Sequence, residues 1–485
     1  MSMTDTAIDV RSEAMPGTEA AVPSDRWRCL AGLSLSVLVP LALGLAPLPL
    51  DLVARKALAI GAFMIIAWIT ESLPYALTGF IGCYLFWALG IAKFSVAFGG
   101  FATETPWFCF GALLFGMMAT KSGLATRLAY LVLAAVGASY SRILFGFVLV
   151  SFLLTLMVPS GSASVVIKAT IALGILSAMG ASKGSNMGRG VFVILTYTAS
   201  MFNKLVIAGS SAILAQGLIQ KFAGVEVLWS RWFLAFLPCT AVTLLVTWRL
   251  GLWLFPCDHK VSTDSAAFVR DQLQRIGPWS APEKKAVLLM GTATALWMTD
   301  FVHHISPAMI GLGAGLAGVL PGIGVLDAED MKKVNVLPVF FVATALSLGQ
   351  VLMDTGAIGL LTTAMFAWMD LLVGGLPSLA LVSYWTAFFY HFFLGSELSM
   401  LSTSLPPLMN FAAVRGFNPM ALGMIWTFAG ASKIFVYQSS VMILGYSYGF
   451  FNGRDLLRFG ACMAIIESVV ILLLASLYWP LIGLG

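Results

Sequence analysis

Apolar stretches with almost no charge recur along nearly the whole chain, from about residue 29 to residue 483. Hydrophobic residues make up 59% of the 485 residues and charged residues only 10%, whereas roughly 25% are charged in a typical soluble domain. A surface with so little charge is stable in lipid, where backbone groups must be paired within their own segment. The pattern predicts an all-α polytopic membrane protein with about ten to twelve spanning elements.

The N-terminal segment differs from the rest of the chain. Its first 28 residues are polar and lack the apolar core of a signal peptide. The first apolar run, 29–50, is long enough to span a bilayer, and Arg26 and Arg28 precede it. Because basic residues favour the cytoplasmic side, we expect residues 1–28 to form a cytoplasmic tail and the protein to lie in a bacterial-type inner membrane.

Several classes of protein lack support in the sequence. The net charge of +5 is mild, so nucleic-acid binding is not indicated. The six cysteines form no CxxC pair and predict neither disulfides nor a metal site. The sequence also lacks the zinc-protease motif HExxH, the P-loop motif GxxxxGK[ST] and the nucleophile motif GxSxG. An enzyme is therefore not predicted.

A charged connector, 256–286, divides the apolar sequence into two halves, 29–255 and 287–485. Its mixture of charged and apolar residues is typical of an amphipathic segment at the membrane surface. Three motifs of the first half return in the second, in the same order and at nearly constant spacing: 68–71 as 297–300, 121–123 as 354–356, and 204–211 as 433–440. This pattern indicates an internal duplication, which is a common plan of secondary transporters.

Each half contains an apolar segment interrupted by small polar residues. The first, 158–164, has the sequence VPSGSAS, and the second, 393–399, has the sequence FLGSELS. Pro and Gly free backbone groups that need partners inside a bilayer, and helix N-termini attract anions. We predict that hydroxyls here donate to a small anion; the alternative is that small residues only let helices pack closely. The predicted donors are Ser160, Ser162, Ser396 and Ser399.

Three ionisable residues inside apolar segments are functional candidates, because a charge in lipid is costly. Lys204 and Lys433 occupy equivalent positions of the two halves. Their ammonium groups would take the electrostatic place of a sodium ion or bind substrate carboxylates, or else snorkel to the membrane interface. Glu397 would couple a proton or pair with a lysine, and the alternative is a purely structural ion pair.

Other polar residues in the apolar segments are expected to have ordinary roles. We expect Lys168 to snorkel and His391 to pack or form a hydrogen bond. Glu71 and Asp300 are expected to cap helices or to lie in turns. Glu467, in the last apolar segment, receives no role.

With these features in order, the chain resembles the divalent-anion:sodium symporter family, which includes dicarboxylate, citrate and sulfate carriers. The similar runs are 67–91, 105–129 and 336–357, and the resemblance covers roughly residues 50–460. It implies an inverted repeat with two re-entrant helical hairpins and interrupted helices. It also implies a homodimer, in which a scaffold holds a transport domain that moves like an elevator.

The resemblance also implies roles for individual residues. The family's Ser-Asn-Thr tips map onto Ser160, Gly161 and Ser162 in the first half. In the second half they map onto Ser396, Glu397 and Leu398, with Ser399 as an alternative register. The unwound segments that follow lie near 208–211 and 437–440, so the candidates for binding sodium or another coupling ion are Ser210, Ser211, Ser439, Ser440 and Glu397.

The chain departs from the family pattern at these same places. Both tips lack the asparagine, and a lysine precedes each unwound segment. Coupling to sodium, coupling to protons and anion exchange therefore all stay open. No cofactor other than sodium ions is expected.

The sequence thus predicts a secondary carrier of a small anion such as a di- or tricarboxylate. Because serine-rich tips suit several anions, a carrier of sulfate or another inorganic oxyanion is the alternative, followed by an anion channel. The expected partners are the anion, membrane lipid and a second copy of the chain.

Overall fold

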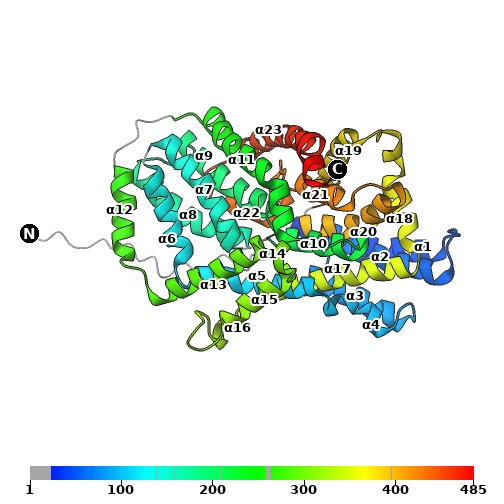
Figure 1. The fold of residues 1–485 in the computed structure, drawn as a ribbon. Helices are drawn as coiled ribbons and strands as arrows, with labels where there is room; N and C mark the ends of the chain where they lie inside the picture. Colours follow the sequence, from blue (N-terminus) through cyan, green and yellow to red (C-terminus); the bar gives the residue numbers. More distant parts are fainter. Residues whose placement is uncertain are drawn as a thin grey trace, which may run out of the picture.

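The computed structural model of the chain describes residues 23–137, 139–158, 160–207, 209–257, 264–394 and 396–484. These residues form helices joined by turns and loops, and none of them belongs to a β-strand (Figure 1). The predicted all-α fold is therefore confirmed. Predictions for residues 1–22 of the tail, and for Pro159, Ala208 and Gly395, concern positions outside the described residues.

The helices follow the division of the sequence into two halves and a connector. The first half contains α1 (Pro23–Leu45), α2 (Leu52–Thr70), α3 (Tyr75–Ala88), α4 (Phe94–Ala97), η1 (Gly99–Ala102), α5 (Glu104–Lys121), α6 (Leu124–Val136), α7 (Tyr140–Met157), α8 (Gly161–Ala178), α9 (Asn186–Met201), η2 (Phe202–Lys204), α10 (Ser210–Ala223) and α11 (Trp229–Leu254). The connector contains α12 (Asp264–Ile276). The second half contains α13 (Ala281–Met298), α14 (Asp300–His303), α15 (Pro307–Ala317), α16 (Ala328–Lys332), α17 (Leu337–Asp354), α18 (Ala357–Phe366), η3 (Ala367–Leu371), α19 (Leu376–Phe393), α20 (Glu397–Arg415), α21 (Pro419–Ala429), η4 (Val436–Gln438), α22 (Ser440–Ser447), α23 (Gly453–Leu473), η5 (Leu474–Tyr478) and η6 (Trp479–Ile482).

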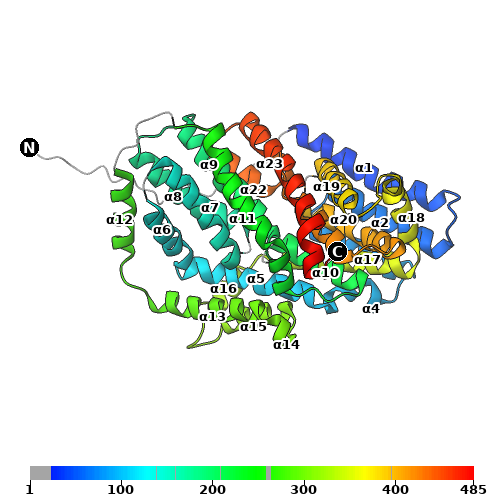
Figure 2. The same ribbon diagram turned by 45° about the horizontal axis from the view of Figure 1, so that its top comes forward.

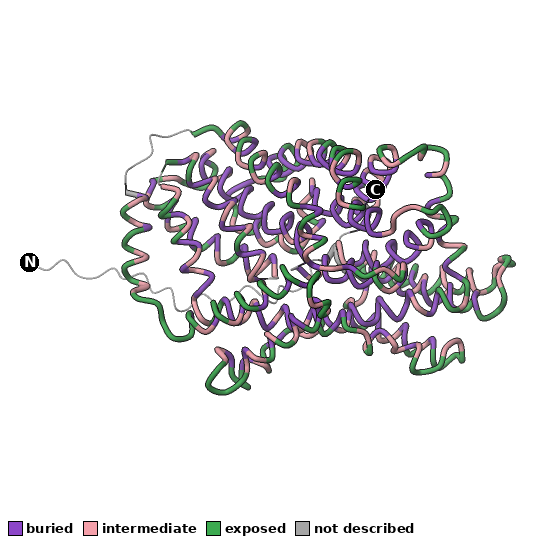
Figure 3. The backbone as a smooth tube through the Cα atoms, viewed as in Figure 1, coloured by how far each residue is buried: buried purple, intermediate pink, exposed green. Residues whose placement is uncertain are grey.

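The helices at the two ends of the molecule frame a buried interior. Helix α1 lies along α2 at one end, and α12 lies at the other end against α6 and α8 (Figures 1 and 2). Buried positions are frequent in the helices between them, whereas exposed positions are frequent on α12 and α16 (Figure 3). The place of α12 at a membrane surface stays a prediction.

Within the described chain, six helices are long and apolar enough to cross a membrane. A seventh span results if the α5–α6 pair, which is bent by 65°, counts as one. Five shorter apolar helices of 10–17 residues accompany them. These are fewer full-length spans than the ten to twelve expected, because some apolar stretches are divided. The stretch 190–220 is split between α9 and α10, and 418–450 between α21 and α22.

Four interruptions position the candidate site. Between α7 and α8 the chain passes through tip 1 (158–162), and between α19 and α20 it passes through tip 2 (394–399). The residues that flank each turn are extended, as at Ser160 (φ −112°, ψ 109°) and Ser396 (φ −126°, ψ 127°). Break 1 (202–209) separates α9 from α10, and break 2 (430–439) separates α21 from α22.

Candidate functional site

The two tips begin their helices in the same way. Ser160 is the N-cap of α8, and its hydroxyl oxygen accepts from the backbone N–H of Ala163 at 3.3 Å. Ser396 is the N-cap of α20, and its hydroxyl oxygen accepts from the N–H of Ser399 at 3.5 Å. A hydroxyl that accepts in this way still carries a proton to donate. Each tip therefore places a hydroxyl at a helix N-terminus, where an anion is favoured.

Both tips contact break 1. A Cβ atom built on Gly161 of tip 1 would lie 3.3 Å from Nδ2 of Asn203. Glu397 of tip 2 forms an ion pair with Lys204. Because Asn203 and Lys204 are consecutive in break 1, the structure brings the interrupted segments of the two halves together.

Glu397 lies between two buried lysines that come from different halves. Its Oε2 atom is 2.9 Å from Nζ of Lys204 and 3.1 Å from Nζ of Lys433. Both ammonium groups also donate to the carbonyl oxygen of Gly430, at 3.0 and 2.8 Å, and Lys204 donates to that of Ser200 at 3.3 Å. Neither lysine side chain is exposed, so snorkelling to the interface does not describe them. We call Lys204, Glu397 and Lys433 the lysine–glutamate cluster.

The cluster has an excess of positive charge and unused hydrogen-bonding capacity. Two ammonium groups face one carboxylate, and buried charges are stable only when they are paired and hydrogen-bonded. Oε1 of Glu397 and Oγ of Ser399 are buried and have no hydrogen-bond partner among the described residues. An unpaired buried polar atom costs about 1–3 kcal/mol. The arrangement therefore suits a polar, anionic ligand that contacts tip 2.

The remaining predicted site residues lie at helix starts near the breaks and in tip 1. Ser210 and Ser211 form the start of α10, and Ser440 is the first residue of α22. Ser439 is the N-cap of α22, and its hydroxyl oxygen accepts from the N–H of Val441 at 3.2 Å. Ser162, in tip 1, is partly exposed. Roles for these residues in holding an ion or a substrate stay predictions.

Lys168 does not snorkel, contrary to expectation. Its side chain is fully buried, and its ammonium group donates to Oγ of Ser151 and to the carbonyl oxygen of Leu195, both at 2.7 Å. The two acceptors belong to α7 and α9. A sequence pattern along α8 alone cannot reveal acceptors on neighbouring helices.

Two acidic residues have the structural roles expected of them. Asp300 caps α11, because its carboxylate accepts from the N–H of Trp229 at 2.7 Å and from the N–H and hydroxyl of Ser230. Glu71 lies in the turn after α2, with a φ of 53°, and accepts from the hydroxyl of Tyr75 at 2.7 Å. These predictions are confirmed.

His391 is buried, and within the described part of the chain neither of its ring nitrogens has a hydrogen-bond partner. Of the two expected roles, packing is therefore the one that the structure supports.

Sequence reasoning missed several groups around the cluster. Asn203 and Ser432 directly precede the two lysines, so the repeat itself contained a signal for both. The carbonyl group of Gly430 had no signal, because every residue has one. Glu467 accepts a hydrogen bond from Ser432, and this contact depends on how α23 packs against break 2.

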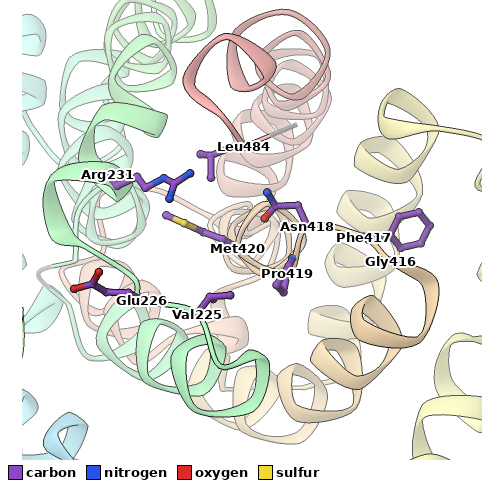
Figure 4. A pocket seen from close by; sticks show the side chains of 9 residues that line it. All are labelled: Val225, Glu226, Arg231, Gly416, Phe417, Asn418, Pro419, Met420 and Leu484. Atoms are coloured by element: carbon purple, nitrogen blue, oxygen red, sulfur yellow. The ribbon is translucent and has the colours of Figure 1, made fainter. Parts of the chain in front are cut away.

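A surface cavity of about 380 Å³ lies away from the cluster, between the chain before α11, the chain before α21 and the C-terminal residues (Figure 4). None of the predicted site residues lines it. Arg231, on its wall, donates to the carbonyl oxygen of Gly483 at 2.9 Å. The lining residues are Val225, Glu226, Arg231, Gly416, Phe417, Asn418, Pro419, Met420 and Leu484. The cavity therefore adds no residue to the candidate site.

Comparison with known proteins decides the family. Residues 28–484 match the sodium:sulfate symporter transmembrane region, the membrane part of the divalent-anion:sodium symporters. The chain belongs to this family. Members of the divalent-anion:sodium symporter family are membrane transporters, so the protein is a multi-pass transporter and not an enzyme.

Relatives within the family extend over nearly the whole chain. They include a membrane protein of Cupriavidus necator, 27% identical over 96% of this chain and 95% of the relative. The L-tartrate/succinate antiporter of Shigella dysenteriae is 23% identical, and the citrate/succinate antiporter of Escherichia coli is 22% identical; each alignment covers 94% of this chain and 98% of the relative. The solved structure of the YdaH transporter of Alcanivorax borkumensis is similar with a TM-score of 0.48 and 17% identity, over 94% of this chain and 98% of that one.

Proposed function

We propose that the protein is a secondary carrier that exchanges small di- and tricarboxylates across a bacterial inner membrane, with its N-terminus in the cytoplasm. The observation that carries the proposal is the buried lysine–glutamate cluster, which joins tip 2 to both breaks. The relatives named as tartrate/succinate and citrate/succinate antiporters support exchange of carboxylates. The family plan supports a homodimer and an elevator-type motion of a transport domain in the lipid.

The two lysines supply the attraction for the anion. An ammonium group held in a water-poor interior attracts a carboxylate more strongly than it does in water. In the structure, Oε2 of Glu397 occupies the acceptor position between the two Nζ atoms. We propose that a substrate carboxylate shares this position, while the hydroxyls of Ser160, Ser162, Ser396 and Ser399 and the N-terminal turns of α8 and α20 bind the rest of the molecule.

Fixed lysines also explain why exchange is favoured over sodium symport. In transporters with interrupted helices, carbonyl oxygens of the unwound backbone coordinate the sodium ion. Here the carbonyl oxygen of Gly430 in break 2 accepts from both ammonium groups. A site built around two cations does not fit a third, so we derive no sodium-coupled step. Without a bound anion the cluster keeps its excess positive charge, which opposes movement of the empty carrier through lipid.

Transport in proteoliposomes tests the proposal. Vesicles loaded with unlabelled succinate receive labelled succinate, citrate, L-tartrate or sulfate outside, with and without a sodium gradient. We expect saturable uptake of a carboxylate that requires the internal anion and is independent of sodium. Strict sodium dependence contradicts the role of the lysines, and preference for sulfate identifies the oxyanion alternative. Flux that neither saturates nor shows counterflow identifies a channel.

Variants connect the transport activity to the cluster. The double substitution Lys204→Ala with Lys433→Ala is expected to abolish exchange. Lys332→Ala is the matched control, because this lysine lies on α16 with 71% of its side chain exposed. Full exchange by the double variant would show that the lysines do not bind the anion.

A further inference from the structure

A second buried glutamate lies directly behind break 2. Glu467, on α23, has no exposed surface. Helix α23 approaches the backbone of break 2 closely, because a Cβ atom built on Gly460 would lie only 2.0 Å from the carbonyl oxygen of Lys433. Figure 2 shows α23 beside α11 and α22 in this part of the molecule. Glu467 therefore belongs to the layer that supports the lysine–glutamate cluster.

Glu467 is hydrogen-bonded to hydroxyl groups. Its Oε2 atom accepts from the hydroxyl of Ser432, and it lies 3.4 Å from the hydroxyl oxygen of Tyr384. The Tyr384 hydroxyl is also 2.6 Å from Oγ of Ser432 and 3.0 Å from the carbonyl oxygen of Ala464. Oε1 of Glu467 is buried and has no hydrogen-bond partner in the part of the chain that the structure describes.

The two buried glutamates thus differ in their partners. Two ammonium groups share Oε2 of Glu397, whereas no ion pair involves Glu467 among the described residues. A buried carboxylate without a cation loses several kcal/mol of solvation, on the order of the cost of an unpaired buried charge. The neutral carboxylic acid avoids most of this loss. Its added proton also gives the second oxygen a donor.

The groups that face Glu467 come from every helix packed against α23. Tyr384 faces it from α19, Cys239 from α11 and Tyr197 from α9. Lys204 and Lys433 act on it from the breaks. Helix α21 contains no titratable residue, and in η5 the hydroxyl of Tyr478 donates to the carbonyl oxygen of Leu234. At neutral pH the charged neighbours are therefore the two lysines and the Glu397 that pairs with them.

The charge of Glu467 decides the charge that an incoming anion meets. Two ionised lysines and one ionised Glu397 leave one positive charge, which an ionised Glu467 cancels and a protonated Glu467 preserves. We propose that Glu467 is a proton-binding site behind break 2, and that its protonation strengthens anion binding at the lysine–glutamate cluster. The proton comes from solution and adds to a carboxylate oxygen, so no bond other than O–H forms or breaks. The effect on anion binding rests on the proposed carboxylate exchange, whereas the proton site does not.

The contacts provide a direct route between the two sites. Ser432 binds Glu467 and is followed in the chain by Lys433. Tyr384 belongs to α19, the helix that leads into tip 2. By linkage, a proton that strengthens anion binding is itself bound more tightly when the anion is present, by the same factor.

Infrared spectroscopy tests the proton site without any substrate. We expect the purified protein in lipid to show the C=O stretch of a buried carboxylic acid near pH 7, and this band to be absent from Glu467→Gln. Glu329→Gln is the matched control, since Glu329 lies on α16 with 71% of its side chain exposed. An identical carboxylic-acid band in wild type and Glu467→Gln between about pH 5 and pH 9 would overturn the proposal. If Glu467→Gln does not fold, Ser432→Ala replaces it, and an unmoved band in that variant has the same meaning.

Anion exchange tests the coupling. L-tartrate is the probe, because both of its carboxyl groups are ionised above roughly pH 6. We expect the apparent affinity of the wild type for tartrate to rise about three- to tenfold from pH 8 to pH 7, the limit for one linked proton being tenfold. Glu467→Gln is expected to have the higher affinity at both pH values. An equal pH dependence in both proteins overturns the coupling. Vesicles that exchange no carboxylate contradict the proposed function, and the infrared result then still decides the proton site.

Discussion

Tip 1 and tip 2 share a backbone design and differ in charge. In both, a serine is the N-cap and accepts from the N–H three residues ahead. The ionisable contacts are not shared, because Lys204 and Lys433, one from each half, both reach Glu397 of tip 2. Tip 1 instead contacts the uncharged side chain of Asn203. The comparison teaches that a duplicated fold can keep equivalent helix breaks while it places its charge at one of them.

This asymmetry suits a substrate with two unequal contacts. One carboxylate of a dicarboxylate would meet the lysines at tip 2, and the other would meet hydroxyls and a helix N-terminus at tip 1. Substitutions at matched positions of the two tips therefore measure how far the division of roles extends.

Glu397→Gln at tip 2 is expected to have the largest effect. It leaves two buried ammonium groups without a carboxylate, and loss of one partner of a buried ion pair costs about 3–5 kcal/mol. We expect a marked fall in the thermal unfolding temperature in detergent, measured by tryptophan fluorescence, and loss of exchange. Glu397→Gln combined with Lys433→Met is expected to regain stability without regaining exchange. Wild-type stability of the single variant would show that tip 2 is no more dependent on charge than tip 1.

Single substitutions of the lysines are expected to have the next largest effect. Lys204→Met and Lys433→Met each leave Glu397 with one ammonium group, so their effect on stability is smaller than that of Glu397→Gln. We expect each to raise the KM for a dicarboxylate about tenfold, equivalent to about 1.4 kcal/mol, with Lys332→Met as the control. A double-mutant cycle is expected to be non-additive, because both lysines bind one oxygen atom. Additive effects would mean that the lysines act separately, one for each half.

The sequence predicted the helical fold, the repeat and the two tips well, because these depend on local patterns. Charge-poor stretches indicate helices in lipid, and Pro, Gly and Ser mark where the helices stop. The number of full-length spans was overestimated, since an apolar stretch such as 190–220 has the same composition whether it is one helix or two.

The partners of the charged residues were not predictable from the sequence. Glu397 and Lys204 are almost two hundred positions apart in the chain and lie 2.9 Å apart in space. The burial of Lys168 depends on Ser151 and Leu195 of neighbouring helices. Glu467 had no interpretation because its environment is created by the packing of α23 on break 2. Local patterns locate such residues but do not pair them.

Ser399→Ala and Ser162→Ala compare the hydroxyls of the two tips. Oγ of Ser399 is buried without a hydrogen-bond partner among the described residues, so its removal is expected to leave the unfolding temperature unchanged or slightly higher. If this hydroxyl donates to the anion, its loss raises KM about fivefold, the value of one hydrogen bond of about 1 kcal/mol. Ser162 is partly exposed, and we expect a smaller rise in KM for Ser162→Ala. A larger effect at Ser162 would assign the main hydroxyl contact to tip 1.

The capping serines are expected to give the smallest and most equal effects. The bonds from Ala163 to Ser160 and from Ser399 to Ser396 are long, at 3.3 and 3.5 Å, so Ser160→Ala and Ser396→Ala each lose about 0.5–1 kcal/mol of helix capping. Ser439→Ala, which removes the cap of α22 at 3.2 Å, is the matched control outside the tips. Equal shifts in unfolding temperature for all three variants support a shared backbone design. A loss several times larger at Ser396 alone would mean that its hydroxyl also supports the charged cluster, and the asymmetry of the two tips would then extend to their caps.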